Sequence, residues 1–295
     1  MKSIIANYVK LFPSILVLVV VLLAGCGGYI TENAYYPEQY YEDRHHELFV
    51  PSGYSDDTPI PIVFAFHGAQ SSGIMTQMGS RLNEYAEPNN FIVVYPNAIE
   101  GLWSCNDVCS DEYGDDINDM GYFDYLLDKF SAEYNLDLTR VYICGFSLGA
   151  RFTMNLALER SNVITAAASV AGNIVYGSWD KFNHAGRVPI AIFNGTSDAS
   201  VPFESAGTGD CERSSIPDMV TKWATHNGCD QSPTIEDLPD TGENYIHVVK
   251  ETYNNCRDNA ETIFYKIEGG SHEWFTFDEF KASAAMTEFF LRHSR

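Results

Sequence analysis

The chain is poor in basic residues: it has 18 Lys and Arg against 40 Asp and Glu in 295 residues, a formal net charge of -22 at pH 7. A surface this acidic repels phosphate backbones and anionic lipid headgroups, which argues against a nucleic-acid partner. The composition suits a solvated protein outside the cytoplasm. The sequence also lacks internal repeats and low-complexity segments, and its length after a signal segment suits one large α/β domain.

The sequence has no uninterrupted apolar run of the roughly 20 residues that cross a membrane comfortably. The longest apolar stretch, Leu11 to Leu23, is interrupted by Pro13 and Ser14, and it follows Lys2 and Lys10. A short apolar stretch behind basic residues is typical of a secretion signal. Residues 1–25 are therefore predicted to be a signal peptide that directs the chain out of the cytoplasm.

The signal segment ends in Leu23-Ala24-Gly25-Cys26, which resembles a bacterial lipobox. The resemblance implies cleavage before Cys26 and a lipid on its sulfur, so the predicted location is extracytoplasmic, with the membrane or cell surface as a partner. Two or more acyl chains would hold the protein there stably. The alternatives are an ordinary signal peptide cut nearby and an uncleaved anchor. Residues 26–43 have no hydrophobic period and predict a polar tether, followed by a single domain over residues 44–295.

Cysteine is scarce, with six residues after Cys26. Disulfides are expected outside the cytoplasm, but many pairings are open. Cys144 lies in an apolar run, where a buried free thiol is the usual state, and Cys105 and Cys109 could close a short loop. Their spacing has no histidine nearby at ligand distance, so the sequence does not predict a zinc site or any other metal site.

Apolar runs and helical periods alternate along the rest of the chain. The runs Pro61–Phe66 and Phe91–Pro96 are apolar throughout, which is typical of strands buried on both faces. Amphipathic spacing predicts helices over residues 81–88, 116–134, 216–226 and 278–292, and shorter apolar runs predict strands over 140–144, 164–170, 188–193, 245–249 and 263–267. This alternation predicts an α/β fold with a mostly parallel sheet covered by helices on both faces.

The most informative motif is Gly145-Phe146-Ser147-Leu148-Gly149, which stands between an apolar run and a helical stretch. A strand, a sharp turn and a helix form a nucleophile elbow, in which strained backbone presents the serine hydroxyl. Bulkier residues in place of the glycines would collide with the adjoining strand and helix. Ser147 is therefore the predicted nucleophile.

A serine hydroxyl needs a histidine base that is itself oriented by a carboxylate. Asp198 follows the apolar run that ends at Phe193, and His272 follows the run that ends at Ile267. The order Ser, Asp, His is that of α/β-hydrolases. Both residues come where strands are predicted to end, the edge at which open α/β sheets place ligands. The simpler alternatives are a turn aspartate and a surface-loop histidine.

An oxyanion hole needs two fixed N–H donors, which stabilise the transition state by about 3 kcal/mol. One candidate is the N–H of Leu148, next to the predicted nucleophile. His67-Gly68 ends a buried run just before Ala69 and Gln70. The second donor is therefore predicted at Ala69 or Gln70.

These residues resemble the secreted α/β-hydrolase esterase family of poly(3-hydroxybutyrate) depolymerases and feruloyl or acetylxylan esterases. The likeness runs from about Arg44 to Trp274 and includes the elbow. It also rests on Pro61–Gly68, Phe91–Pro96, Asp119–Phe123 with Arg140–Tyr142, Gly195–Asp198 with Val201-Pro202, Trp223–Cys229 and Cys256–Trp274.

The resemblance implies that Ser147, Asp198 and His272 are a catalytic triad. It also implies a disulfide between Cys229 and Cys256, which would stabilise the fold by about 3 kcal/mol. The sequence departs from the family at Ser271, where a glycine is usual before the histidine, and at Phe275, where a proline is usual after the tryptophan. We place these positions at the border of the acyl pocket. Trp103 and Trp274 are the candidate pocket walls, with ordinary core aromatics as the alternative.

The predicted function is an extracytoplasmic serine carboxylic-ester hydrolase that works through an acyl-enzyme and needs no metal or organic cofactor. Its predicted substrates are feruloyl or acetyl esters on plant polysaccharide, because the chain leaves no room for the separate substrate-binding domain usual in depolymerases of solid polyester. Polyester depolymerization is the first alternative. A serine peptidase and a non-catalytic surface binding protein on a hydrolase scaffold are further alternatives.

Overall fold

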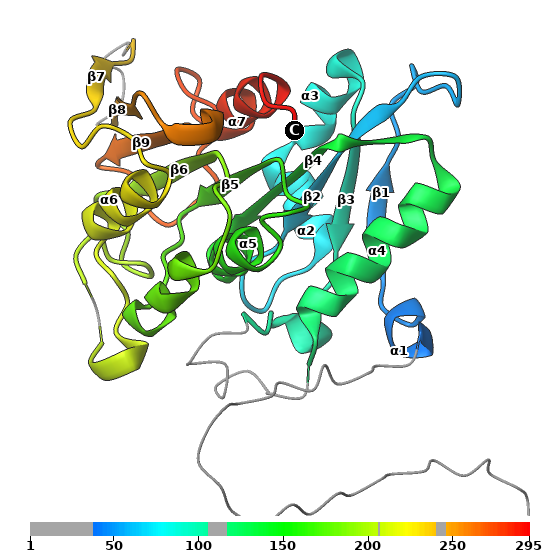
Figure 1. Ribbon diagram of the computed structural model, residues 1–295, viewed down its shortest axis with the longest axis horizontal. Helices are drawn as coiled ribbons and strands as arrows, with labels where there is room; N and C mark the ends of the chain where they lie inside the picture. Colours follow the sequence, from blue (N-terminus) through cyan, green and yellow to red (C-terminus); the bar gives the residue numbers. More distant parts are fainter. Residues whose placement is uncertain (1–37, 106–116, 206, 240–245) are drawn as a thin grey trace, which may run out of the picture. The chain divides into compact units, whose positions relative to one another are not determined.

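The central feature of the fold is one sheet of nine strands, seen in a computed structural model that describes residues 38–105, 117–205, 207–239 and 246–295 (Figure 1). The order across the sheet is β1-β3-β2-β4-β5-β6-β9-β8-β7. The strands are β1 (His46–Phe49), β2 (Ile60–Phe66), β3 (Ile92–Pro96), β4 (Leu136–Phe146), β5 (Ala166–Val170), β6 (Ile190–Gly195), β7 (Thr234–Asp237), β8 (His247–Tyr253) and β9 (Thr262–Glu268).

The middle of this sheet is parallel. From β3 through β2, β4, β5 and β6 to β9, each neighbouring pair of strands runs in the same direction. Only the edges are antiparallel, where β1 pairs with β3, β8 with β9 and β7 with β8. The predicted mostly parallel α/β sheet is confirmed, and its parallel strands all bring their carboxyl ends to one edge.

Helices cover both faces of the sheet (Figure 1). Successive strand residues point to opposite sides, so Phe64 joins the core under one set of helices and Val63 the core under the other. The first face carries α4 (Asp119–Glu133), α5 (Leu148–Glu159) and α6 (Ile216–His226). The second carries α2 (Gly73–Ser80), α3 (Leu82–Asn89) and α7 (Ala282–Leu291). Burial on both faces explains why the central strands are apolar throughout.

Side-chain caps fix where two of these helices begin. Asn118 accepts a hydrogen bond from the N–H of Gly121 at the start of α4, at 2.8 Å, and Ser215 accepts one from the N–H of Asp218 in α6, at 3.1 Å. Each cap satisfies one of the N–H groups that a first helical turn leaves without a partner. The cap at Ser215 explains why α6 begins at Ile216, as predicted.

The predicted elements agree with the structure except at chain segments without a clear period. The closing helix begins at Ala282 rather than at residue 278, because residues 276 and 281 form an isolated bridge before it. The edge strands β1 and β7 and the helix α2 were not predicted. The helix α1 (Glu38–Glu42) lies within the predicted tether, and Tyr41 stacks on Tyr122 of α4. Residues ahead of 44 therefore pack on the domain.

The described cysteines differ in bonding and in burial. Cys229 and Cys256 form a disulfide, and Cys211 is also disulfide-bonded. Cys144 is a fully buried thiol in β4, and burial raises its pKa. Cys105 is buried as well, while its predicted partner Cys109 lies outside the described residues. Cys26 and the signal segment also lie outside them.

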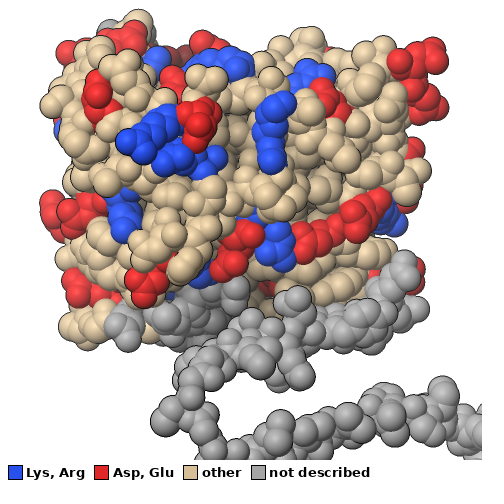
Figure 2. All heavy atoms as spheres, in the orientation of Figure 1, with Lys and Arg blue, Asp and Glu red and all other residues tan. Residues whose placement is uncertain are grey.

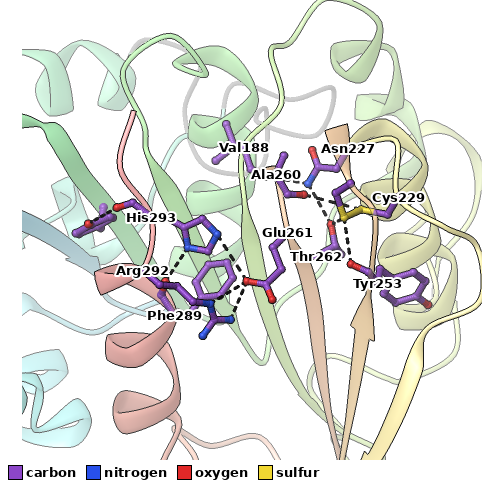
Figure 3. Close-up of polar contacts among 12 residues, drawn as sticks. Val188, Asn227, Cys229, Tyr253, Ala260, Glu261, Thr262, Phe289, Arg292 and His293 are labelled. Carbon is purple, nitrogen blue, oxygen red and sulfur yellow. Dashed lines mark hydrogen bonds and ion pairs between the residues drawn. A yellow bond between two sulfur atoms is a disulfide. The ribbon is translucent and has the colours of Figure 1, made fainter. Parts of the chain in front are cut away.

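The start of β9 is held to its neighbours by side chains (Figure 3). Arg292, just after α7, donates to Glu261, just before β9, with Nη2 at 2.8 Å from Oε2. The buried amide of Asn227 donates to the carbonyl oxygen of Val188 and to Thr262 Oγ1, each at 3.0 Å. These contacts fix the amino-terminal end of β9, whose other end leads to His272.

The face shown in Figure 2 carries acidic and basic side chains interspersed among uncharged ones. In the part of the chain that the structure describes, no helix combines the length and apolar character needed to span a bilayer.

Candidate active site

Ser147 stands alone in the turn between β4 and α5, in a strained backbone conformation. Its φ is 55° and its ψ is -117°, a region that residues other than glycine rarely adopt. A Cβ on Gly145 would lie 2.2 Å from the carbonyl oxygen of Gly149, and one on Gly149 would lie 2.4 Å from that of His67. The two glycines therefore let strand and helix approach closely enough to form the elbow.

Three side chains far apart in the sequence meet at the carboxyl edge of the sheet. His272 Nε2 lies 2.9 Å from Ser147 Oγ, and His272 Nδ1 lies 2.7 Å from Asp198 Oδ2. With Nδ1–H donating to the carboxylate, Nε2 accepts the hydroxyl proton of the serine. This is the arrangement by which a histidine can take a proton from a serine nucleophile.

The turns that carry Asp198 and His272 are fastened to each other. The N–H of Ser197 donates to the carbonyl oxygen of Gly270, at 2.9 Å, and the N–H of Gly269 donates to Thr196 Oγ1, also at 2.9 Å. A Cβ on Gly195 would lie 2.2 Å from the same Gly270 oxygen. Glycine at these positions is therefore what allows the two turns to touch, which sets the distance between the carboxylate and the imidazole.

The Asp198 carboxylate is completely buried and fully engaged. Its Oδ1 accepts from the N–H groups of Ser200 and Val201, each at 2.8 Å, and its Oδ2 faces His272. Burial is the largest single influence and raises the pKa of Asp198, but together the hydrogen bonds with His272 and the two N–H groups outweigh it and lower the pKa overall. The carboxylate stays charged at neutral pH, with a fixed orientation.

A cavity of about 100 Å³ opens beside Ser147. Ala69 and Leu148, the two predicted oxyanion donors, both line it. The N–H of the alternative donor, Gln70, is already used: it donates to the carbonyl oxygen of Gly101 at 2.8 Å. This contact favours Ala69 over Gln70 as the second donor.

His67 fixes the turn that carries Ala69. The ring is fully buried, its Nε2 accepts from the N–H of Ala98 at 2.9 Å, and its Nδ1 donates to the carbonyl oxygen of Gly68 at 2.7 Å. Burial, with a smaller influence from Arg44, lowers the pKa of His67, so the ring is neutral. His67 therefore braces the backbone of the turn and takes no part in proton transfer to Ser147.

The two tryptophans have different positions. Trp103 is 0% exposed, stacks on Phe152 with ring centroids 5.0 Å apart, and donates from Nε1 to the carbonyl oxygen of His67. Trp103 is a core residue beneath the site. The prediction that it forms an accessible pocket wall is therefore wrong, and the alternative, an ordinary core aromatic, is what the structure shows. Trp274 is partly exposed and donates to Ser283 Oγ at 2.8 Å, and its ring lies beside Phe146. Neither tryptophan lines the cavity at Ser147.

The two departures from the family pattern also lie away from this cavity. Ser271 is exposed and donates to Glu273 Oε1 at 2.5 Å, whereas Phe275 is 0% exposed in the core under α7. Their predicted position at the border of the acyl pocket is not what the structure shows, because one side chain points to solvent and the other into the core.

Four polar lining residues were missed by sequence reasoning: Arg151, Asn173, Ser200 and Arg213. The position of Arg151 one helical turn after Ser147 was a usable signal, but the other three lie on loops that only the tertiary fold brings to the nucleophile. A larger cavity, of about 540 Å³, lies at the opposite end of β9, around Glu261 and Arg292. Its lining holds no hydrogen-bonded pair of nucleophile and base, so the smaller cavity is the candidate active site.

No group of three or more His, Cys, Asp or Glu side chains that could hold a metal ion occurs within residues 38–105, 117–205, 207–239 and 246–295.

A parallel sheet with an elbow serine hydrogen-bonded to a histidine and an aspartate at its carboxyl edge defines an α/β-hydrolase. The fold is shared with the acetyl xylan esterase from Aspergillus awamori, at a TM-score of 0.61 and 16% identity over 84% of this chain and 94% of that one. The chain belongs to the esterase PHB depolymerase family, whose model matches residues 45–192.

Curated relatives are similar over longer stretches. A feruloyl esterase B of Piromyces equi is 27% identical over 235 residues, which cover 75% of this chain and 41% of the relative. A bifunctional acetylxylan esterase/xylanase of Neocallimastix patriciarum is 30% identical over 164 residues, or 55% of this chain and 22% of the relative. This chain thus spans less than half the length of these two relatives.

Proposed function

We propose that this protein is a serine carboxylic-ester hydrolase. The observation that carries the proposal is the pair of hydrogen bonds that links Ser147 to His272 and His272 to Asp198, beside a cavity open to a substrate. The family and the named esterase relatives support the same reaction class.

In the proposed mechanism, Ser147 Oγ attacks the ester carbonyl carbon while His272 Nε2 takes its proton. Asp198 stabilises the imidazolium that forms. The developing oxyanion accepts hydrogen bonds from the N–H groups of Leu148 and Ala69. Departure of the alcohol, protonated by His272, leaves an acyl-enzyme, and a water activated by His272 then releases the acid.

We further propose esters on plant polysaccharide as substrates, in line with the names of the relatives. The cavity of about 100 Å³ beside Ser147 is where the acyl group would bind. Polyester depolymerization is the second candidate, favoured by the family model.

The proposal places the protein outside the cytoplasm. The Cys229–Cys256 disulfide is in keeping with an oxidising compartment. The lipobox-like residues that end in Cys26 support a lipid anchor at the membrane or cell surface. Radiolabelled palmitate incorporated into the wild-type protein but not into Cys26→Ala would support the anchor, and equal labelling of both would contradict it.

The activity is tested by measuring hydrolysis of p-nitrophenyl acetate, methyl ferulate and a short 3-hydroxybutyrate oligomer side by side. Ser147→Ala serves as the blank, and its kcat should be lower by several orders of magnitude. Acetate or ferulate as the best acyl group supports the main proposal, and preference for the oligomer supports the second candidate. Near wild-type activity of Ser147→Ala would overturn the assignment of the nucleophile.

A further inference from the structure

The cavity beside Ser147 is basic, although the whole chain is strongly acidic. Two of its lining residues, Arg151 and Arg213, are cationic, and no Asp or Glu is among the described residues that line it. The formal net charge of the protein is -22, so an anion is repelled at long range. A guanidinium group without an ion-pair partner among the described residues, such as that of Arg213, therefore needs a local reason beside the nucleophile.

Of the two arginines, Arg213 gives the stronger evidence for a bound anion. It lies on the loop before α6, where residues 175 and 213 form an isolated bridge, and it is half-buried. Its Nη1 donates to the carbonyl oxygen of Ser200, at 3.0 Å. No ion pair joins Arg213 to any residue that the structure describes. Most of its five N–H donors are therefore available to a bound molecule.

The contact with Ser200 also positions Arg213 relative to the reacting atoms. The N–H of Ser200 donates to Asp198, so one short loop holds both the buried carboxylate and the arginine. Arg151 follows Ser147 by one turn of α5 and is 8% exposed. Because Arg151 makes further contacts of its own, the inference rests on Arg213 alone.

We propose that Arg213 selects esters that carry a carboxylate within a few bonds of the scissile carbonyl. A carboxylate fits the planar fork of a guanidinium with two parallel hydrogen bonds, and such charge-assisted bonds are stronger than neutral ones. The carboxylate belongs either to the acyl group or to the alcohol, and in both cases Arg213 binds it while Ser147 attacks the ester carbon. This inference rests on the proposed esterase function and adds the substrate's charge to it.

The test compares matched pairs of substrates that differ in charge and little else. For the acyl side, the pair is p-nitrophenyl hemisuccinate, which is anionic, and p-nitrophenyl levulinate, which is neutral and of similar shape. For the alcohol side, the pair is 3-acetoxybutanoate, which is anionic, and 3-acetoxybutanamide, which is neutral and has no second ester. The measured quantity is the ratio of kcat/KM for the anionic member to that for the neutral member, after correction for spontaneous hydrolysis.

We expect the anionic member of one pair to be preferred by about 10- to 100-fold in the wild-type enzyme. Arg213→Gln should reduce that ratio to near one, and Arg213→Lys, which keeps the charge but not the fork, should retain part of it. The matched control is Arg187→Gln. Arg187 pairs with Asp258 at the other end of the sheet and should leave the ratio unchanged.

The ratio separates recognition from a merely structural role. If Arg213 only held the loop of Ser200, its loss would slow both members equally, and an unchanged ratio in Arg213→Gln would overturn the inference. A wild-type enzyme that hydrolyses the neutral members without preferring either anion would overturn it too, while the esterase function would stand.

If the wild-type protein hydrolyses neither these four esters nor p-nitrophenyl acetate, methyl ferulate and the 3-hydroxybutyrate oligomer, the proposed function fails, and the inference is then decided by binding. Titration calorimetry with succinate on the wild-type protein and on Arg213→Gln gives that answer. Binding that weakens by about tenfold in the variant supports an anion site. Equal or absent binding in both proteins overturns it.

Discussion

The replacement Asp198→Asn tests how the triad works, because the structure specifies how the new amide must turn. Asp198 Oδ1 accepts two N–H groups, from Ser200 and Val201. An asparagine keeps these bonds only if its carbonyl oxygen takes the place of Oδ1. Its NH₂ group then faces His272 Nδ1, which must become an acceptor.

The change of tautomer has a calculable consequence. With Nδ1 accepting, the proton of neutral His272 resides on Nε2, and the ring can no longer accept the hydroxyl proton of Ser147, 2.9 Å away. A serine triad with its carboxylate replaced in this way loses about 10⁴ in kcat, which corresponds to about 5.5 kcal/mol in the barrier. The fold should persist, since both backbone bonds to the side chain survive.

Steady-state hydrolysis of p-nitrophenyl acetate, with circular dichroism to verify folding, measures the effect. Asp137→Asn is the matched control, because Asp137 also accepts two hydrogen bonds from a neighbour, Thr139. Burial raises the pKa of Asp137, but its hydrogen bonds with Thr139 and Arg140 outweigh burial and lower the pKa overall. Asp137 lies at the start of β4, far from the site. A folded Asp198→Asn enzyme within tenfold of wild-type kcat would refute the reasoning.

Three further predictions concern the elbow glycine, the disulfide and the dependence of activity on pH. Gly149→Ala should abolish activity or folding, because its Cβ would lie 2.4 Å from two backbone carbonyl oxygens, whereas Gly79→Ala, with nothing within 4 Å, should behave as wild type in activity and thermal denaturation. Cys256→Ala removes the disulfide with Cys229, which joins residues separated by 27 positions in the sequence. This variant should lower the free energy of unfolding, measured by urea titration, by about 3.5 kcal/mol, and an unchanged free energy would contradict the prediction. Finally, kcat/KM should fall with one-proton dependence on acidification, because protonated His272 cannot accept the Ser147 proton, and a flat profile from neutral to acid pH would exclude this histidine as the base.

The acid limb should belong to a single group. The pKa of Asp198 is lower in the folded protein than its ordinary value, so this carboxylate stays charged from neutral pH down to below about 3.9. Its contribution to stability is present above the unfolded pKa, about 3.9, and is lost only as the pH falls through the lower folded value. A second proton uptake in the kinetic profile between neutral pH and that range would contradict the observed contacts of Asp198.

Sequence patterns were sufficient for those parts of the molecule that depend on local contacts and burial. The continuous apolar runs predicted β2 and β3 because strands covered on both faces exclude polar residues. The pattern of glycines around Ser147 predicted an elbow because only a residue without a side chain fits between the strand and the helix. The edge strands β1 and β7 escaped prediction because short, partly exposed strands carry no such pattern.

What only the tertiary structure decided depends on residues distant in the sequence. The hydrogen bond of Gln70 to Gly101, which favours Ala69 as the oxyanion donor, joins two loops whose meeting leaves no local signal. The same is true of Trp103, whose burial follows from packing against Phe152. It is also true of Arg213, which lines the cavity beside Ser147 and donates to Ser200. Local sequence thus determined the elements and the order of the reactive residues, whereas the packing of loops over the sheet decided which backbone donors and charges face the substrate.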